Sequence, residues 1–366
     1  MRTRSPETVA MMRLGLTLTV LRSARALQQL TRRHASVAPS EGKKRVVFLG
    51  SPGVAALTLG RLLDADGDFD VVAAVSQPPA PKGRKRILQP CEVQALAEER
   101  NLRCLTPAKA RDPEFLEELT ALKPDVCVTA AYGQFLPKSF LSIPLLGTLN
   151  IHPSLLPRWR GAAPVQRSLE NGDEKVGVTV LQTVLKMDAG PIAAQSVPRA
   201  VKEGDTAATL LDELFDEGCD LLINDVLPSL FDGSLEMREQ NDSDVTEAPK
   251  LTKDEGFLDV LGASPDSRTI AEACRDKVRA FAPWPGTFLN VRAGDAAYRL
   301  KVLEARIGDA VDSVSYRKPA LSIPCADGSA LDLLRVQPPN KKAMDAASFW
   351  NGLRGAELEF LGLEDP

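Results

Sequence analysis

Two polar residues, Asn150 and His152, lie two positions apart in the stretch LNIHPSLLPRWRGAAP, residues 149–164. An imidazole can accept a proton near neutral pH and return it, and an asparagine N–H can hold an oxygen on which negative charge develops. In an extended strand, residues i and i+2 point to the same side, so one carbonyl group could meet both side chains. The pair therefore favours chemistry at a carbonyl carbon.

A third polar residue, Asp188 in the string MDAGPI, follows the next long predicted strand. A carboxylate at that point could orient the imidazole or keep it charged. No GxSxG-type elbow marks a nucleophilic serine or cysteine, which favours direct transfer between two bound substrates over a covalent intermediate. Of the two histidines in the chain, His152 is the stronger candidate for catalysis. The other, His34, lies in the arginine-rich first forty residues, which are predicted below to be a leader.

The elements that must position these residues follow from an alternation of apolar strand patterns with helical patterns. We predict strands at residues 44–50, 69–76, 101–106, 124–133, 147–153 and 175–184, and helices at residues 54–66, 91–101, 113–123, 163–172 and 206–233. This order predicts an α/β fold with a Rossmann-like, doubly wound, mostly parallel sheet. Ligands bind beyond the carboxyl ends of the strands in such sheets, which is where His152 falls.

The chain is long enough for two domains after a leader. We expect a catalytic domain at residues 41–232 and a polar linker at residues 233–255. Residues 256–366 hold one helical stretch followed by several short strand patterns. These predict a small C-terminal β-barrel domain of the OB-like kind.

The first forty residues contain seven arginines, no lysine and one acid, Glu7, with apolar residues at helical spacing. This pattern is typical of an organelle transit peptide. We expect delivery to the mitochondrial matrix, with a plastid as the alternative. The apolar run at residues 14–21 is too short to span a bilayer, so no membrane association is expected.

Charge and cysteine usage limit the function classes. The whole chain has a formal net charge of −4, so residues 41–366 carry about −10 once the leader is set aside. An acidic body argues against nonspecific nucleic-acid binding as the main activity. The six cysteines form no CxxC pair, which argues against a zinc site and a disulfide framework, and no metal is expected.

The sequence resembles the folate-dependent formyltransferases, and among them most closely the methionyl-tRNA formyltransferases. The family pattern Asn-x-His-x-Ser-Leu-Leu-Pro, followed by a glycine and a later Asp-x-Gly, is present at residues 150–190. Further matching strings are VVFLGSP, AAYGQFLP, PKLTKDEG, VRAFAPWPG and VQPPNKKAM, so the resemblance covers nearly all of the chain after the leader.

The resemblance implies that the formyl group of 10-formyltetrahydrofolate passes to the α-amino group of methionine on initiator tRNA. It assigns Asn150, His152 and Asp188 to catalysis. It also implies a folate-contacting loop at Ser154, Leu155, Leu156 and Pro157, and a pterin contact at Tyr132 and Gly133. Pro153 stands where bacterial-type tRNA enzymes often have glycine, and relatives that act on other amines share it. We expect a monomer.

The same resemblance implies two contacts with tRNA. A cationic loop in residues 77–90 would enter the acceptor stem, and a second contact would lie in the C-terminal domain. The residues assigned to these contacts are Lys82, Arg84, Lys85, Arg86, Lys341 and Lys342. The family loop usually carries Asp-Arg where this chain has Pro79 and Ala80, so the detailed pose of the loop stays open.

Three alternatives remain at this point. A sibling enzyme could pass the same formyl group to a small amine, such as glycinamide ribonucleotide or an amino sugar, but it would not need the C-terminal domain or the cationic loop. An RNA-binding module without catalysis would not need Asn150, His152 and Asp188. A dinucleotide-dependent oxidoreductase is disfavoured because the turn at residues 50–53 is not GxGxxG.

Overall fold

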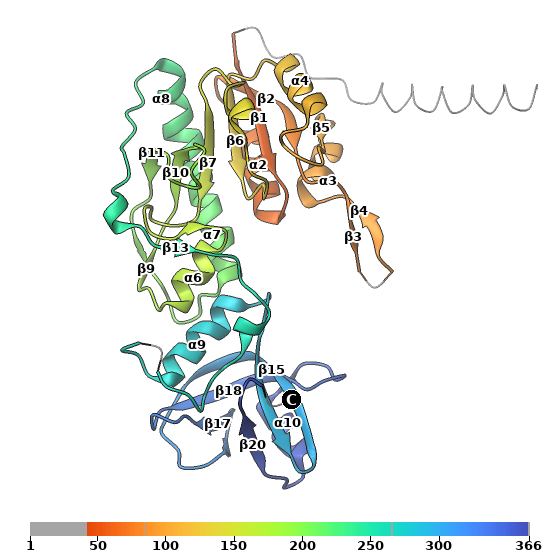
Figure 1. Ribbon diagram of the computed structural model, residues 1–366, viewed down its shortest axis with the longest axis vertical. Coiled ribbons are helices and arrows are strands. Elements are labelled where there is room, and N and C mark those ends of the chain that lie inside the picture. Colours follow the sequence, from red (N-terminus) through yellow and green to blue (C-terminus); the bar gives the residue numbers. More distant parts are fainter. Residues whose placement is uncertain (1–41, 84, 265, 365–366) are drawn as a thin grey trace, which may run out of the picture. The chain divides into compact units, whose positions relative to one another are not determined.

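The computed structural model describes residues 42–83, 85–264 and 266–364 (Figure 1). The predicted transit peptide and Arg84 lie outside the described residues. The chain divides into two compact units between Leu149 and Asn150, within one strand. Each unit has its own arrangement of elements.

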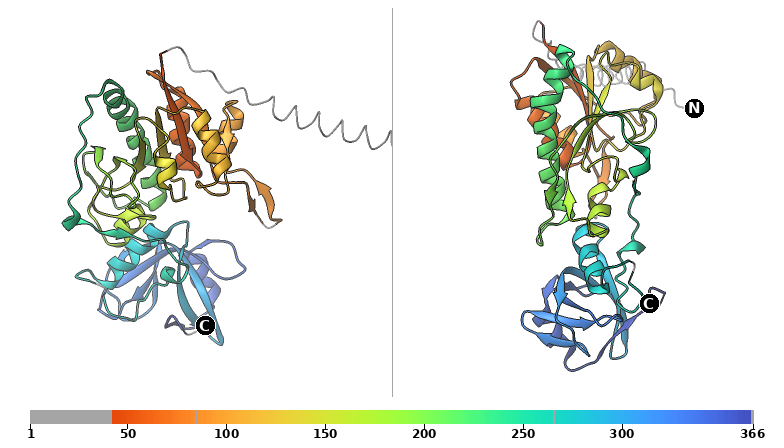
Figure 2. Two further views of the ribbon diagram at one scale, coloured as in Figure 1. Left: turned by 45° about the horizontal axis from the view of Figure 1, so that its top comes forward. Right: turned by 90° about the vertical axis from the view of Figure 1, so that its left-hand side faces the viewer.

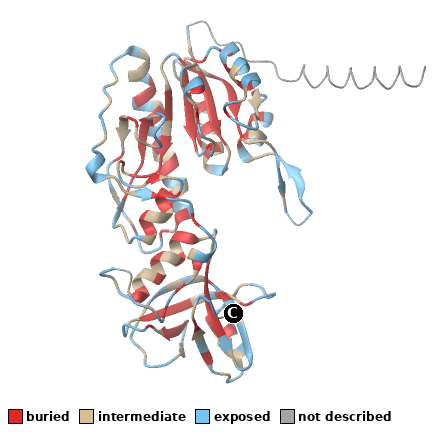
Figure 3. Cartoon of the chain, in the orientation of Figure 1, coloured by how far each residue is buried: buried red, intermediate tan, exposed pale blue. Residues whose placement is uncertain are grey.

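The first unit is built on parallel strands in the order β6-β1-β2-β5. The strands are β1 (Lys44–Gly50), β2 (Phe69–Val75), β5 (Cys104–Leu105) and β6 (Val126–Ala130). The helices are α2 (Gly53–Asp64), α3 (Glu92–Glu99), α4 (Pro113–Ala121) and α5 (Lys138–Leu141). Strands β1, β2 and β6 are mostly apolar and are buried along nearly their whole length, as a covered parallel sheet requires (Figure 3). The predicted α/β class is confirmed.

A hairpin projects from this unit, as Figure 1 shows. It consists of β3 (Ala80–Lys82) and β4 (Ile87–Gln89), which pair antiparallel. All three residues of β4 are exposed, including the apolar Ile87 and Leu88. Residues 77–90, the predicted cationic loop, therefore include both strands of this hairpin.

In the second unit the strand order is β11-β10-β7. Two short strand pairs, β8 with β13 and β9 with β12, accompany these strands. The strands are β7 (Thr148–His152), β8 (Arg160–Gly161), β9 (Lys175–Val176), β10 (Thr179–Gln182), β11 (Ile192–Gln195), β12 (Arg199–Ala200) and β13 (Glu247–Ala248). The helices are α6 (Pro164–Glu170), α7 (Ala207–Asp220) and α8 (Leu227–Asp232), the last two joined by a π-helical stretch at Leu221–Val226.

The single strand predicted for residues 175–184 is wrong, because the structure has two strands there. β9 pairs with β12, whereas β10 pairs with β11. The break falls at Gly177, where a Cβ atom would lie 2.5 Å from Leu155 Cδ2 and 2.7 Å from Ser196 Oγ. The Ser196 hydroxyl also accepts the Val178 N–H at 3.0 Å, so a side chain replaces a ladder hydrogen bond.

The C-terminal part of the second unit is an antiparallel sheet covered by helix α9, as the two views of Figure 2 show. The strand order is β16-β17-β18-β15-β14-β20, with β19 paired to β18. The elements are α9 (Ile270–Phe281), β14 (Thr287–Ala293), β15 (Ala296–Gly308), β16 (Ser315–Arg317), β17 (Ala320–Pro324), β18 (Ala330–Gln337), β19 (Met344–Asp345), α10 (Ala346–Leu353) and β20 (Leu358–Leu361). This antiparallel sheet confirms the β-rich fold predicted for the C-terminal part, and its OB-like barrel form stays a prediction.

The described residues contain no helix that is both long and apolar enough to cross a membrane. In the same residues, no group of three or more histidine, cysteine or acidic side chains is arranged to hold a metal ion. All six cysteines are free thiols.

Candidate active site

The three predicted catalytic residues come together at the end of β7. Asn150 Nδ2 donates to Asp188 Oδ1 at 3.5 Å, and His152 Nδ1 lies 3.7 Å from Asp188 Oδ2. The second of these distances is too long for a hydrogen bond, so it is an electrostatic contact. Asn150 and His152 therefore point to the same side of the strand, as their spacing of two predicted, and both side chains face the Asp188 carboxylate.

The orientation of the His152 ring is fixed from its far side. His152 is only 4% exposed, and its Nε2 lies 2.8 Å from the carbonyl oxygen of Trp159. A carbonyl oxygen can only accept, so Nε2 carries the proton of this hydrogen bond. Nδ1 is left facing Asp188 as the nitrogen that can take up or release a proton.

Trp159, which supplies that carbonyl, is itself held on two sides. Its backbone N–H donates to Thr246 Oγ1 at 2.8 Å, and its indole Nε1 donates to Asp173 Oδ2 at 2.6 Å. Its φ of 63° lies in the left-handed region, which is uncommon for a bulky residue. The ring of His152 is thus positioned by a chain of contacts that ends on residues 173 and 246.

Asp188 also has a left-handed backbone, with φ of 48°, and is held by the loops around it. Its Oδ2 accepts the backbone N–H of Gly161 at 2.9 Å, and its carbonyl oxygen accepts Gln240 Nε2 at 2.8 Å. Such backbone conformations persist where the surroundings determine them, and they cluster at functional sites. The carboxylate therefore has a defined direction toward Asn150 and His152.

Arg160 and Gln240 belong to this support, and neither was predicted from the sequence. Arg160 is 6% exposed, and its Nε donates to Gln240 Oε1 at 3.0 Å. Gln240 Nε2 donates in turn to the carbonyl oxygens of Asp188 and Gly190. Gln240 lies in residues 233–255, the predicted linker, which also contains the strand Glu247–Ala248. That segment therefore supports the site as well as connecting two parts of the chain.

The predicted folate loop at residues 154–157 is anchored by β10 and β11. Thr179 Oγ1 donates to the Ser154 carbonyl oxygen at 2.6 Å, and Gln195 Nε2 donates to the Leu156 carbonyl oxygen at 3.0 Å. Leu156 is buried against Leu181 and Ile192. Ser154 and Leu156 are buried, whereas Leu155 and Pro157 are partly exposed. The folate contact of this loop stays a prediction.

Comparisons with known proteins point to one family. Residues 44–226 match the family described as Formyl transferase, and residues 268–354 match its C-terminal domain family. Methionyl-tRNA formyltransferase of Methylobacterium sp. is 41% identical over 86% of this chain and 97% of its own length. The enzyme of the same name from Pseudomonas fluorescens is 40% identical over 85% of this chain and 93% of its own length.

The chain belongs to the methionyl-tRNA formyltransferase family.

Solved structures show the same fold at lower identity. An N-formyltransferase from Helicobacter canadensis in complex with folinic acid and dTDP-3-aminofucose has a TM-score of 0.57, at 15% identity over 81% of this chain and 99% of that one. HypX from Aquifex aeolicus in complex with tetrahydrofolic acid has a TM-score of 0.53, at 16% identity over 86% of this chain and 48% of that one. These two structures support the formyltransferase fold of the family.

The predicted pterin turn at Tyr132 and Gly133 lies in the first unit. The Tyr132 side chain is buried, and the exposed residue of the pair is Gly133, which has no side chain. Tyr132 is 4% exposed, its hydroxyl has no hydrogen-bond partner among the described residues, and burial raises its pKa. Its carbonyl oxygen accepts Gln77 Nε2 at 3.1 Å, and Gln134 Nε2 donates to Gln77 Oε1 at 3.2 Å. Gly133 has φ of 80° and is exposed. Its contact with a pterin stays a prediction.

The residues predicted to bind tRNA fall in two places, one in each unit. Lys85 and Arg86 are exposed on the hairpin, and Lys82 pairs with Glu92 Oε1 at 2.8 Å. That hydrogen bond lowers the pKa of Glu92. Lys341 and Lys342 are exposed in the turn after β18. All five of these cations are thus accessible at least in part, as phosphate contacts require.

Proposed function

We propose that this chain transfers the formyl group of 10-formyltetrahydrofolate to the α-amino group of methionyl initiator tRNA. The observation that carries the proposal is the convergence of Asn150, His152 and Asp188 on one point, in a chain 41% identical to a methionyl-tRNA formyltransferase over nearly its whole length.

In the proposed reaction the amine nitrogen attacks the formyl carbon, and a new C–N bond forms as the carbonyl becomes an oxyanion. The Asn150 amide and His152, protonated at Nδ1, stabilise this negative charge. Collapse of the oxyanion breaks the bond between the formyl carbon and N10 of the folate. His152 Nδ1 would give its proton to N10 as that bond breaks. The proton lost by the amine would then return to Nδ1, with Asp188 beside the imidazolium.

The test is a formylation assay with the full chain, 10-formyltetrahydrofolate and methionine-charged initiator tRNA. We expect formyl-methionyl-tRNA, with less product on elongator methionyl-tRNA. Formylation of a small amine such as glycinamide ribonucleotide or an amino sugar, without product on either tRNA, would overturn the proposal and favour the alternative acceptor.

We also propose that residues 1–40 direct the protein to the mitochondrial matrix, where the product would serve translation initiation. Seven arginines and one acid support this proposal. Fusion of these residues to a fluorescent reporter should send the reporter to mitochondria. A reporter that stays in the cytosol, or that enters plastids, would contradict it.

We predict that Arg84→Ala raises the KM for methionyl-tRNA about tenfold and leaves the KM for the formyl donor within about twofold. The reason is that Arg84 stands between Gly83 and Lys85 in the cationic loop, where a guanidinium can contact phosphate or a base. The variant should also show a weaker dependence of tRNA binding on salt.

The matched control for Arg84→Ala is Arg100→Ala in the same unit. Arg100 pairs with Asp64 at 2.7 Å on the surface, outside the predicted tRNA loop. Equal losses for tRNA and formyl donor in Arg84→Ala, or an equal effect of Arg100→Ala, would count against a tRNA contact at this loop.

A further inference from the structure

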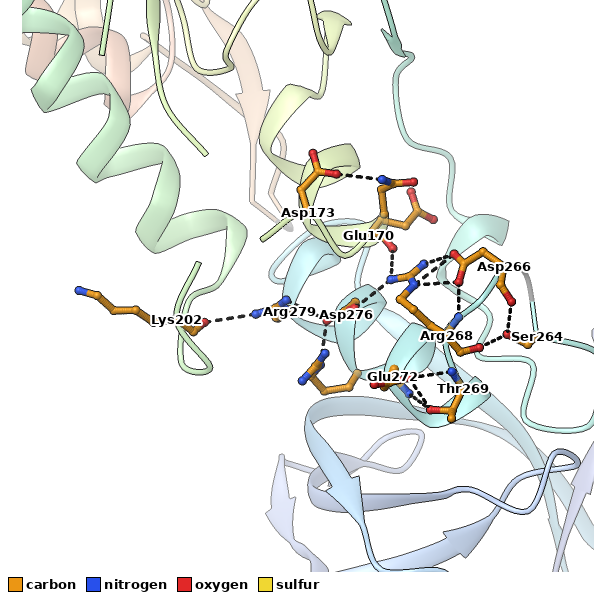
Figure 4. Close-up of polar contacts among 12 residues, drawn as sticks. Glu170, Asp173, Lys202, Ser264, Asp266, Arg268, Thr269, Glu272, Asp276 and Arg279 are labelled. Carbon is orange, nitrogen blue, oxygen red and sulfur yellow. Dashed lines mark hydrogen bonds and ion pairs between the residues drawn. The ribbon is translucent and has the colours of Figure 1, made fainter. Parts of the chain in front are cut away.

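Asp276 on helix α9 is a buried carboxylate that meets three arginines (Figure 4). It is only 1% exposed. Its Oδ2 lies 2.9 Å from Arg268 Nη1, and its Oδ1 lies 2.8 Å from Arg275 Nε and 2.9 Å from Arg279 Nη2. A buried charge is costly unless it is paired, so the arginines and the carboxylate depend on one another.

Asp276 does not belong to the face of α9 that packs on the C-terminal sheet. That face holds Ile270, Cys274 and Val278, which lie in the same apolar cluster as the strands. At 100° per residue, position 276 is on the other side of the helix. Asp276 is therefore buried on the side of α9 that faces α6 and α7. These helices belong to residues 150–232, which hold the candidate active site and are called the catalytic part of the unit.

Two of the three arginines reach across to that catalytic part, as Figure 4 shows. Arg268 Nη1 donates to the carbonyl oxygen of Glu170, the last residue of α6, at 2.9 Å. Arg279 Nη1 donates to the carbonyl oxygen of Lys202 at 3.2 Å. One carboxylate thus holds two guanidinium groups that contact two separate segments of the catalytic part.

Gly172 gives independent support for this junction. It follows α6, has φ of 73°, and lies against Arg268. A Cβ atom there would come within 2.7 Å of Arg268 Nη1 and 3.1 Å of Arg268 Cδ. A larger residue at this position would have to displace the guanidinium, so the absence of a side chain leaves room for the bridge.

The charges explain why the carboxylate is needed. Burial lowers the pKa of Arg279, and Asp276 opposes that shift. Arg268 has a second partner in Asp266, whose hydrogen bond raises the pKa of Arg268. Without Asp276 the three guanidinium groups would repel one another in a poorly solvated place. Arg268 and Arg279 would then lose the alignment that lets them reach Glu170 and Lys202.

We propose that Asp276 is a positioning residue that, through Arg268 and Arg279, fixes the C-terminal sheet on the catalytic part of its unit. This inference rests on the proposed function. A tRNA that contacts Lys341 and Lys342 while its methionyl end reaches His152 needs a fixed separation between the two places. If the contact between the C-terminal sheet and the catalytic part were loose, the distance between Lys341 and His152 would vary. Binding of the tRNA at both places would then cost more conformational entropy, and its affinity would fall.

The test compares Asp276→Asn with Asp332→Asn in the full chain. Asp332 is a matched control because it is also buried, at 5% exposure, and pairs with Arg306 at 3.0 Å inside the C-terminal sheet. We expect Asp276→Asn to raise the KM for methionyl-tRNA about tenfold, with kcat and the KM for the formyl donor within about twofold. Asp332→Asn should lower Tm without moving the KM for tRNA.

Hydrogen exchange gives a second readout that does not depend on activity. The amides of residues 170–174 and 201–205 should exchange faster in Asp276→Asn than in Asp332→Asn. Unchanged exchange in these segments, or equal KM changes in both variants, would overturn the positioning role. If the wild-type chain does not formylate methionyl-tRNA, the proposed function fails, while the exchange comparison still decides whether the junction exists.

Discussion

His152→Ala is expected to lower kcat/KM for formyl transfer about 1,000-fold or more, the combined order of magnitude for loss of a proton carrier and of an oxyanion donor. His152 Nε2 is engaged with the Trp159 carbonyl oxygen, so Nδ1 is the nitrogen available for chemistry. It lies 3.7 Å from Asp188 Oδ2. No other described side chain is a histidine, so none can take over this role from a nearby position.

The measurement is single-turnover formylation with saturating methionyl-tRNA, with circular dichroism as a check on folding. Imidazole added to His152→Ala should restore part of the rate, because the substitution leaves a space of the right shape beside Asp188. His34→Ala is the matched control, since it removes the only other histidine, within the predicted transit peptide. A His152→Ala rate near that of wild type would remove His152 from the mechanism.

The first unit of the fold was predictable because its signals are local. Strand β1 is an uninterrupted apolar run between a charged start and a glycine, and β2 and β6 are also mostly apolar. Helix α2 places Ala55, Leu59 and Leu62 on one buried face at helical spacing. Such patterns involve only residues that are close together in the chain, so they can be read directly from the sequence.

The second unit was less predictable because its decisive contacts join distant positions. The string KVGVTVLQTV has the composition of one strand, and only the close approach of Leu155 and Ser196 to Gly177 divides it. Gln240 lies in a polar stretch typical of a linker, and its role depends on Arg160, 80 residues earlier in the chain. No periodicity marks a pairing of that kind.

Asn150, His152 and Asp188 were predictable in part. Asn150 and His152 were recognisable from their spacing and from the strand that carries them. The local sequence did not reveal that Asp188 takes a hydrogen bond from a backbone N–H, or that the Trp159 carbonyl selects the protonated nitrogen of His152. Backbone groups look alike in every sequence, so their roles emerge only from the fold.

The backbone of Gly161 leads to the second large expected effect. Gly161 donates its N–H to Asp188 Oδ2 at 2.9 Å and has φ of 132°, a region that disfavours other residues. A Cβ atom there would lie 2.5 Å from the carbonyl oxygen and 3.0 Å from the carbonyl carbon of Ala248. These are backbone atoms of β13, the partner strand of β8, so they cannot move aside as a flexible side chain would.

Gly161→Ala must therefore push β13 away or withdraw the N–H from Asp188. We expect a loss of about 2–4 kcal/mol in the free energy of unfolding, from strain and from the displaced strand. Because the carboxylate would lose its fixed direction toward Asn150 and His152, kcat should also fall about 100-fold. Denaturant unfolding and single-turnover formylation measure the two effects separately.

Gly204→Ala is the matched control for the methyl group itself. A Cβ atom at Gly204 meets nothing within 4 Å, and its backbone is outside the left-handed region. That variant should keep both stability and kcat near the wild-type values. If Gly161→Ala lowers stability but leaves kcat unchanged, the backbone N–H of Gly161 is dispensable for holding Asp188. If kcat falls at temperatures where the variant is fully folded, the glycine acts on the reaction through the carboxylate that it positions.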